Sequence, residues 1–130
     1  MSTITNLNKA HVAYIDDDKL HLEALRQKFE RKGIAVSLFS DANEALDYVA
    51  ANPNQFKIII SDFLLEGSIR GDQVVREIKR VNSNIHTVIL SSEIDRNVMR
   101  ACRNSGADQT YNKNDGPDIL VCLSEVAKLK

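Results

Sequence analysis

The chain has 130 residues, of which 43% are hydrophobic and 27% charged, and its formal net charge is −1. These values predict a single folded domain over residues 1–130 and exclude a disordered polymer. The near-neutral charge argues against direct binding of nucleic acid through its phosphates. No apolar run approaches the roughly 20 residues of a membrane span, and the start of the chain lacks a signal-peptide core, so no membrane contact and a cytoplasmic location are expected.

Two hydrophobic patterns alternate along the chain. Short apolar runs, typical of parallel strands that are buried on both faces, predict strands at 12–15, 34–39, 58–60, 87–90 and 107–112. Apolar residues at helical spacing lie between and after these runs. They form five predicted helical stripes: Leu22, Leu25 and Phe29; Ala42, Ala45, Leu46 and Val49; Val74, Val75, Ile78 and Val81; Ile94, Val98, Ala101 and Cys102; and Ile119, Leu120, Leu123, Val126 and Ala127.

Residues that favour helix ends agree with these boundaries. Asp18 and Asp41 precede the first two predicted helices, where a side-chain oxygen can accept hydrogen bonds from the first turn. Gly33 follows the first helix, where a left-handed cap favours glycine. Strands that alternate strictly with helices predict a doubly wound α/β fold. The expected sheet is five-stranded and parallel, in the flavodoxin-like order 2-1-3-4-5, with five flanking helices.

Acidic residues follow the first and third predicted strands. Asp16, Asp17 and Asp18 come directly after the first, and Asp62 comes at the end of the third. Because ligands of such sheets bind at the carboxyl ends of the strands, where the strand order reverses, we expect these carboxylates to lie close together. A divalent cation would offset their repulsion, and oxygen ligands favour Mg²⁺, with Mn²⁺ as the second choice. The competing interpretation is helix capping, which is expected of Asp18.

A serine and a lysine follow the fourth and fifth predicted strands. Ser91 and Lys113 would bring a hydroxyl and an ammonium group to the edge that carries Asp62. Such donors around a carboxylate suit the oxygens of a phosphoryl group. Taken singly, Ser91 is a candidate helix cap and Lys113 a solvated loop residue. Their expected position at the same edge of the sheet as Asp62 favours phosphoryl binding. Asp62 is therefore the predicted nucleophile, which would form an aspartyl phosphate.

Together these features resemble the receiver domain of two-component response regulators, over roughly His11 to Lys128. The matching stretches are Val12–Asp18, Ile58–Asp62, Val88–Ser92 and Gly106–Asp108 followed by Lys113. The resemblance implies a signalling switch that accepts a phosphoryl group from a histidine kinase or a histidine phosphotransfer protein. It also implies a downstream effector protein or domain as a partner. It implies a phosphoacceptor that promotes its own phosphorylation and dephosphorylation, and not an enzyme acting on other molecules.

The same resemblance assigns a role to each strand-end residue. The implied metal ligands are Asp16, Asp17, Asp62 and the backbone carbonyl of Leu64. Asp62 would be the phosphoacceptor and Ser91 the switch hydroxyl that binds the phosphoryl oxygens. Lys113 would be their ion-pair partner.

The chain departs from the family pattern at several places. Leu65-Glu66 replaces the usual Met-Pro after the acceptor, and Gly71, which opens the third helix, comes one residue late. Thr110 stands where the family usually has an aromatic residue, and the aromatic Tyr111 follows it. Asn114 replaces a proline that is often cis, so a trans peptide is expected there. A reshaped loop and altered coupling through the fifth strand are predicted.

Two other functions compete with the phosphorylated switch. A degenerate receiver would act as a constitutive protein-interaction module, with no phosphorylation. A metal-dependent phosphatase is disfavoured because Leu64 occupies the position of its second acid. The spacing of His11, His21 and His86 indicates no metal site or catalytic dyad, so no role in the chemistry is predicted for them.

Basic residues recur along the predicted fourth helix. Arg96, Arg100 and Arg103 lie at a spacing that places them on one face. This stripe is either a solvated surface or a docking site for an acidic partner or a second copy of the domain. The second interpretation predicts a homodimer through the face of the fourth and fifth helices.

Overall fold

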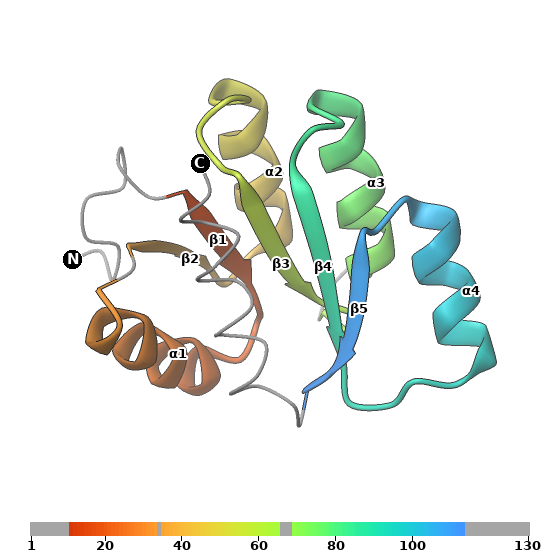
Figure 1. Ribbon diagram of the computed structural model, residues 1–130, viewed down its shortest axis with the longest axis horizontal. Helices are drawn as coiled ribbons and strands as arrows, with labels where there is room; N and C mark the ends of the chain where they lie inside the picture. Colours follow the sequence, from red (N-terminus) through yellow and green to blue (C-terminus); the bar gives the residue numbers. More distant parts are fainter. Residues whose placement is uncertain (1–10, 34, 66–68, 114–130) are drawn as a thin grey trace.

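The computed structural model describes residues 11–33, 35–65 and 69–113 of the chain (Figure 1). The strands are β1 (Val12–Ile15), β2 (Val36–Phe39), β3 (Ile58–Asp62), β4 (His86–Ser91) and β5 (Gln109–Asn112). The helices are α1 (Lys19–Arg31), α2 (Ala42–Ala51), α3 (Gly71–Val81) and α4 (Arg96–Ser105). The predicted fifth helix, over 119–127, and the peptide bond before Asn114 lie outside the described residues. None of the four described helices has the length and apolar content of a membrane span.

The five strands form one parallel sheet in the order β2-β1-β3-β4-β5, which confirms the predicted topology. The strand order reverses at β1, which pairs with β2 on one side and β3 on the other. Ile15, the last residue of β1, lies opposite Ser61 of β3. The residues that follow Ile15 and Ser61 in the chain are therefore neighbours at the carboxyl edge of the sheet.

Helices cover both faces of the sheet (Figure 1). The alternating side chains of the strands are buried beneath them. On one face, Tyr14 and Ile60 pack with Leu22 and Phe29 of α1. On the other, strand residues pack with Val49 of α2 and with residues of α3. Strands buried on both faces need apolar side chains in succession, and this explains the continuous runs in β1 and β3. The doubly wound fold is confirmed.

α4 packs at the β5 end of the sheet (Figure 1). Its Cys102 joins Phe63, Val75 and Ile89 in a third apolar cluster, and the cysteine is 1% exposed. This cluster joins α3, β4 and α4, so the helix is held by apolar contacts on its inner side.

Helix ends follow the predicted side-chain chemistry in the first half of the chain. The carboxylate of Asp18 accepts hydrogen bonds from the backbone N–H groups of Leu20 and His21, and Asp41 caps α2 in the same way. Gly33 adopts a φ of 70° just after α1. These residues place the start of α1 beside the end of β1, where the acidic residues lie.

Two predicted apolar contacts are wrong. Val81, at the end of α3, is 39% exposed, because the last residue of the helix lies beyond the edge of the core. Ile94 is also exposed and precedes α4. The helix begins at Arg96, because the Asp95 carboxylate accepts from the Val98 N–H and caps it.

Candidate functional site

Three carboxylates meet at the carboxyl edge of the sheet, where β1 and β3 end. The side chains of Asp16, Asp17 and Asp62 offer oxygen atoms that all lie within 4.8 Å of one another. Asp16 is fully buried, and Asp62 is 7% exposed. We call these three residues the acidic cluster. The predicted convergence of the acids is thus observed, and it follows from the pairing of β1 with β3.

Lys113 brings a positive charge to the acidic cluster from the end of β5. Its Nζ donates a hydrogen bond to Asp62 Oδ2 at 3.0 Å and lies 3.5 Å from Asp16 Oδ2. The predicted lysine therefore bridges two of the three carboxylates. Lys113 comes directly after the last residue of β5. Because β3, β4 and β5 pair in parallel, Lys113 lies at the same edge of the sheet as Asp62.

The electrostatics of the acidic cluster leave it with excess negative charge. Burial raises the pKa of the Asp62 carboxyl above its usual value, the hydrogen bond from Lys113 lowers it, and the neighbouring Asp16 raises it again. Burial lowers the pKa of Lys113, but the hydrogen bond to Asp62 and the negative charges of Asp62 and Asp16 together outweigh burial and leave the pKa raised. At Asp62, burial and the neighbouring carboxylates together outweigh the contribution of Lys113, because the pKa of Asp62 remains raised. A cluster of oxygen donors with excess negative charge fits a hard divalent cation.

Gly71 allows α3 to begin against the end of β3. Its N–H donates to the carbonyl oxygen of Phe63 at 2.8 Å. A Cβ atom at this position would lie 2.2 Å from the carbonyl oxygen of Asp62, so only glycine fits. Gly71 comes one residue later than in the family pattern, but it still permits close contact between α3 and β3. Residues 66–68 of the preceding loop lie outside the described part of the chain.

Ser91 and Leu64 are less closely joined to the acidic cluster. Ser91 lies at the end of β4 and is buried, and its Oγ donates to the carbonyl oxygen of Glu93 at 2.6 Å. In this conformation the hydroxyl is engaged by its own loop. The side chain of Leu64 is 64% exposed and points away from the core. The switch role of Ser91 and the metal-binding role of the Leu64 carbonyl stay predictions.

The aromatic residue of β5 lies on the opposite face of the sheet from Thr110. Thr110 hydrogen-bonds the thiol of Cys102 on the α4 side. Tyr111 packs against the cluster that contains Leu22 and Leu90 on the α1 side. Successive side chains of a strand point to opposite faces, so a shift of one residue moves the aromatic ring to the other side. The altered coupling expected from the sequence stays a prediction, because the position of the ring alone does not test it.

Sequence reasoning missed a contact of His21. Its Nδ1 lies 2.5 Å from Oδ2 of the buried Asp16. The signal was present in the sequence, because His21 stands three residues after the capping Asp18. A side chain in the first turn of a helix tilts back towards the helix N-terminus, and therefore towards the end of the preceding strand.

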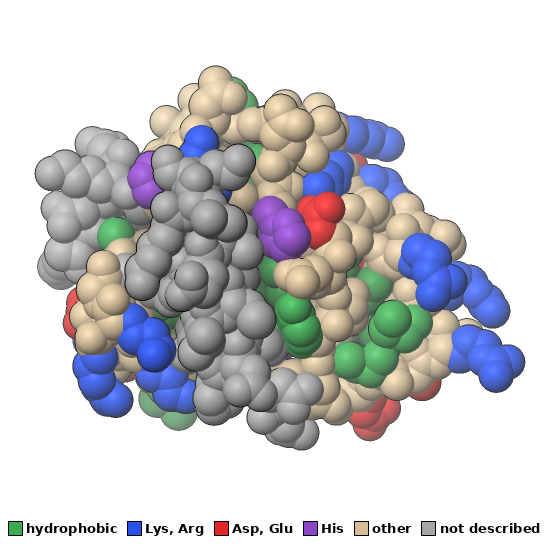
Figure 2. Space-filling model, in the orientation of Figure 1, with side chains coloured by type: hydrophobic (Ala, Val, Ile, Leu, Met, Phe, Trp, Pro, Cys, Tyr) green, Lys and Arg blue, Asp and Glu red, His purple; other side chains and the backbone are tan. Residues whose placement is uncertain are grey.

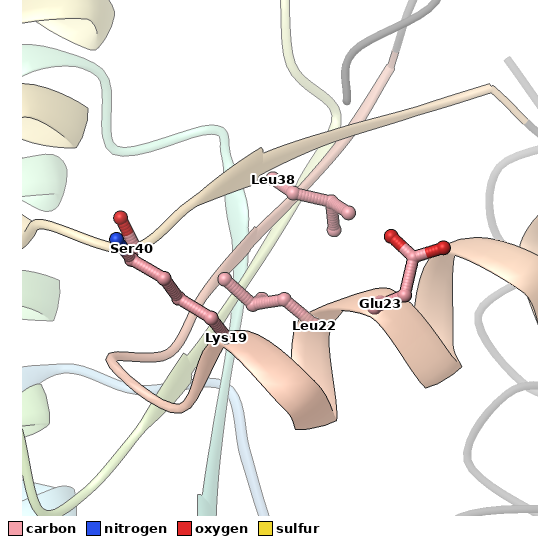
Figure 3. Close-up of a pocket in the computed structure, with 5 residues that line it drawn as sticks. All are labelled: Lys19, Leu22, Glu23, Leu38 and Ser40. Atoms are coloured by element: carbon pink, nitrogen blue, oxygen red, sulfur yellow. The ribbon is translucent and has the colours of Figure 1, made fainter. Parts of the chain in front are cut away.

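A separate pocket of about 200 Å³ lies between the start of α1 and the end of β2. Its described lining residues are Lys19, Leu22, Glu23, Leu38 and Ser40 (Figure 3). Leu22 and Leu38 lie between Lys19 and Ser40 on one side and Glu23 on the other (Figure 3). None of the predicted site residues is among them, so the chemistry is assigned to the acidic cluster and not to this pocket.

The family model of the response regulator receiver domain matches residues 12–123. The chain belongs to this family. Receiver domains in general interact with histidine kinases and with downstream effectors, and they typically bind a divalent metal. The acidic cluster is thus the part of this receiver domain that could hold such an ion. A comparison with curated protein sequences finds no significant match.

Solved receiver structures share the fold of this chain over most of its length. A two-component response regulator from Clostridium difficile has a TM-score of 0.79 at 22% identity, covering 92% of this chain and 96% of its own. Vibrio cholerae chemotaxis protein CheY4 has a TM-score of 0.78 at 22% identity, covering 90% and 98%. The receiver domain of the Francisella response regulator 1452 has a TM-score of 0.73 at 26% identity, covering 92% and 98%. The flavodoxin-like receiver fold is therefore shared at low sequence identity.

Proposed function

We propose that this receiver domain accepts a phosphoryl group on Asp62 and acts as a phosphorylation-dependent switch. The observation that carries the proposal is the arrangement of Asp62, which is buried, hydrogen-bonded to Lys113 and grouped with Asp16 and Asp17. The donor would be a histidine kinase or a histidine phosphotransfer protein, in keeping with the family. The residues that would hold Mg²⁺, or Mn²⁺ in its place, are Asp16, Asp17, Asp62 and the Leu64 carbonyl.

The proposed transfer uses Asp62 as the nucleophile. One of its carboxylate oxygens forms a bond to phosphorus while the bond between phosphorus and the imidazole nitrogen of the donor breaks. The electron pair of the broken bond stays on that nitrogen, so no oxidant or reductant is needed. The Lys113 ammonium, 3.0 Å from Asp62, can follow the charge onto the phosphoryl oxygens. A bound divalent cation supplies further neutralisation of the phosphoryl charge.

The proposed switch depends on the Ser91 hydroxyl. It is bonded to the Glu93 carbonyl at 2.6 Å, and it must leave this bond to reach a phosphoryl oxygen on Asp62. The two arrangements of Ser91 are then the two states whose balance phosphorylation changes. In this view the protein is a phosphoacceptor that promotes its own phosphorylation and dephosphorylation, and it catalyses no reaction on a separate substrate.

The proposed output surface includes α4. Arg96, Arg100 and Arg103 are all exposed, and Lys and Arg side chains gather over the α4 side of the molecule (Figure 2). Such a stripe suits an acidic face of an effector or of a second receiver domain. The second case would give a homodimer through the face of α4 and the predicted fifth helix, which lies outside the described residues. Replacing all three arginines by alanine should weaken self-association and effector binding; unchanged binding would remove this surface from the proposal.

The acceptor assignment is tested by mass spectrometry of the intact protein after treatment with acetyl phosphate. The wild type should gain one phosphoryl group with Mg²⁺ and far less in EDTA. Asp62→Asn should gain none, because the amide is not a nucleophile. Asp108→Asn is the matched control, since Asp108 lies at the amino end of β5 and should leave labelling unchanged. Labelling of Asp62→Asn to the wild-type level would contradict the assignment.

A constitutive interaction module is the second candidate function. It is favoured by one observation, the placement of Tyr111 on the α1 side of the sheet instead of the α4 side. Titration with beryllofluoride and Mg²⁺, monitored by NMR, separates the two functions. A switch should show shifts of Ser91 and α4 resonances as the reagent binds. A constitutive module should show none.

A further inference from the structure

His21 contacts the most deeply buried carboxylate of the acidic cluster. Its Nδ1 lies 2.5 Å from Asp16 Oδ2, and Asp16 itself is fully buried. A carboxylate can only accept, so the hydrogen atom of this bond is on His21 Nδ1. Within the described part of the chain, the Asp16 carboxylate has two further contacts: the Asp18 N–H donates to Oδ1 at 3.0 Å, and the Lys113 ammonium lies 3.5 Å from Oδ2. Among these contacts, the bond from His21 is the shortest.

The position of His21 is fixed on three sides. Its backbone N–H donates to the side chain of Asp18 at 3.2 Å, which sets its place in the first turn of α1. Its ring meets the ring of Tyr14 edge-on, with centroids 5.9 Å apart and an interplanar angle of 83°. Tyr14 is 1% exposed and cannot move without disturbing the core. The Nδ1 donor is thus held by the backbone, by an aromatic contact and by the carboxylate that it binds.

We propose that His21 is a positioning residue that orients the Asp16 carboxylate for a divalent cation, and so sets the affinity and selectivity of the acidic cluster. This inference rests on the metal site of the proposed function. Side chains that hydrogen-bond metal ligands fix the direction of the ligand oxygen, and their loss typically lowers metal affinity about 10- to 100-fold. His21 is placed to do this, because it holds Oδ2 while the Asp18 N–H holds Oδ1.

Loss of the His21 donor would change the contacts of Asp16 in a definite way. The carboxylate would keep the Asp18 N–H on Oδ1, and Oδ2 would keep only the longer contact to Lys113 among those described above. The carboxylate plane would then be free to rotate about its bond to the Cβ atom. Mg²⁺ demands nearly ideal octahedral geometry, whereas Ca²⁺ tolerates varied geometry and ligand number. A positioning role therefore predicts a larger loss for Mg²⁺ than for Ca²⁺.

The test is calorimetric titration of the full chain with Mg²⁺ and with Ca²⁺. His21→Phe keeps an aromatic ring against Tyr14 but has no donor, and His21→Asn keeps a donor close to the place of Nδ1. We expect His21→Phe to bind Mg²⁺ about tenfold more weakly, with a loss for Ca²⁺ of less than about threefold. His21→Asn should stay within about threefold of the wild type for both ions. His86→Asn is the matched control, because His86 bonds Gln109 at the amino end of β4.

The possible failures of this experiment are distinguishable. Wild-type protein that binds no Mg²⁺ would overturn the metal site of the proposed function and this inference with it. Wild-type binding that His21→Phe retains in full would overturn the inference alone. Equal losses for both ions in His21→Phe and His21→Asn would show a structural role, which also overturns it. Thermal unfolding verifies that each variant is folded, and His21→Leu, which also lacks the donor, replaces the Phe variant if that protein does not fold.

Discussion

Two ion pairs of the same residue types lie at opposite edges of the sheet and differ in their surroundings. At the carboxyl edge, Lys113 lies 3.0 Å from Asp62. At the amino edge, Lys79 of α3 lies 2.7 Å from Asp108, which precedes β5. The pKa of Asp62 is raised by burial, whereas that of Asp108 is lowered, because bonds from Lys79 and Thr87 outweigh its burial.

The difference comes from the balance of partners. Lys79 also donates to the carbonyl oxygens of Ser83 and Ile85, and Asp108 accepts from both the N–H and the hydroxyl of Thr87. Both members of the amino-edge pair thus have further hydrogen-bonding groups besides each other. At the carboxyl edge, Lys113 is shared between two members of a group of three carboxylates. A Lys–Asp pair therefore stabilises the fold at one edge and leaves unbalanced charge for ligand chemistry at the other.

Glycine substitutions give the largest expected difference between the two edges. Gly71→Ala places a Cβ atom 2.2 Å from the Asp62 carbonyl oxygen, which is backbone and cannot move aside. We expect the free energy of unfolding to fall by at least about 3 kcal/mol. Gly106, at the amino edge, has a φ of 92°, and a Cβ atom there would make only an ordinary van der Waals contact, 3.7 Å from the Cγ atom of Lys79. Alanine at this position should therefore cost about 1 kcal/mol, mainly from backbone strain. Urea unfolding of both variants measures this; equal losses would contradict the close-approach argument.

Lysine substitutions give an intermediate effect and a test with metal. Lys113→Met removes the shared ammonium from the acidic cluster, so we expect a loss of about 2 kcal/mol in EDTA. Saturating Mg²⁺ should restore part of this loss, because the cation would replace the missing positive charge. Lys79→Met should lose about 1 kcal/mol from its bonds to Asp108 and the carbonyl groups, with no dependence on Mg²⁺. If Mg²⁺ also restored the stability of Lys79→Met, the two edges would not differ in their response to a cation, contrary to the prediction.

Aspartate substitutions give the smallest effect, but of opposite sign at the two edges. The pKa of Asp108 is lowered by folding, so its contribution is full above its unfolded pKa of about 3.9 and is lost as the pH falls through its folded value. Asp108→Asn should therefore lose about 1 kcal/mol at neutral pH, after discounting for solvent exposure, and match the wild type in acid. Asp62→Asn should be neutral or slightly stabilising at neutral pH in EDTA. Urea unfolding at several pH values measures the stability of both variants. A marked loss of stability in Asp62→Asn would contradict the excess of negative charge in the acidic cluster.

The topology of the sheet could be predicted from the sequence because the same hydrophobic pattern recurs along the chain. Apolar runs and helical stripes alternate, and parallel topology then leaves few strand orders, so the meeting of Asp16 with Asp62 could be predicted. Lys113 could be placed at the same edge by the same reasoning.

What could not be predicted depends on local competition between hydrogen bonds. The sequence makes Ser91 a candidate helix cap, but its hydroxyl bonds the Glu93 carbonyl oxygen, and Asp95 caps α4 instead. The face of the sheet on which Tyr111 lies depends on the register of β5, and a shift of one residue would move its ring to the opposite face. His21 was missed because its partner lies on the preceding strand, and spacing between histidines carries no information about such a contact.

The burial of Cys102 has a practical consequence. Its thiol is 1% exposed, hydrogen-bonded by Thr110 and raised in pKa by burial, so it is a poor nucleophile while α4 is in place. Alkylating reagents therefore reach this sulfur only when α4 separates from the sheet. In a variant with Cys122 replaced by serine, Cys102 is the remaining cysteine, and the rate of its alkylation measures how often α4 opens.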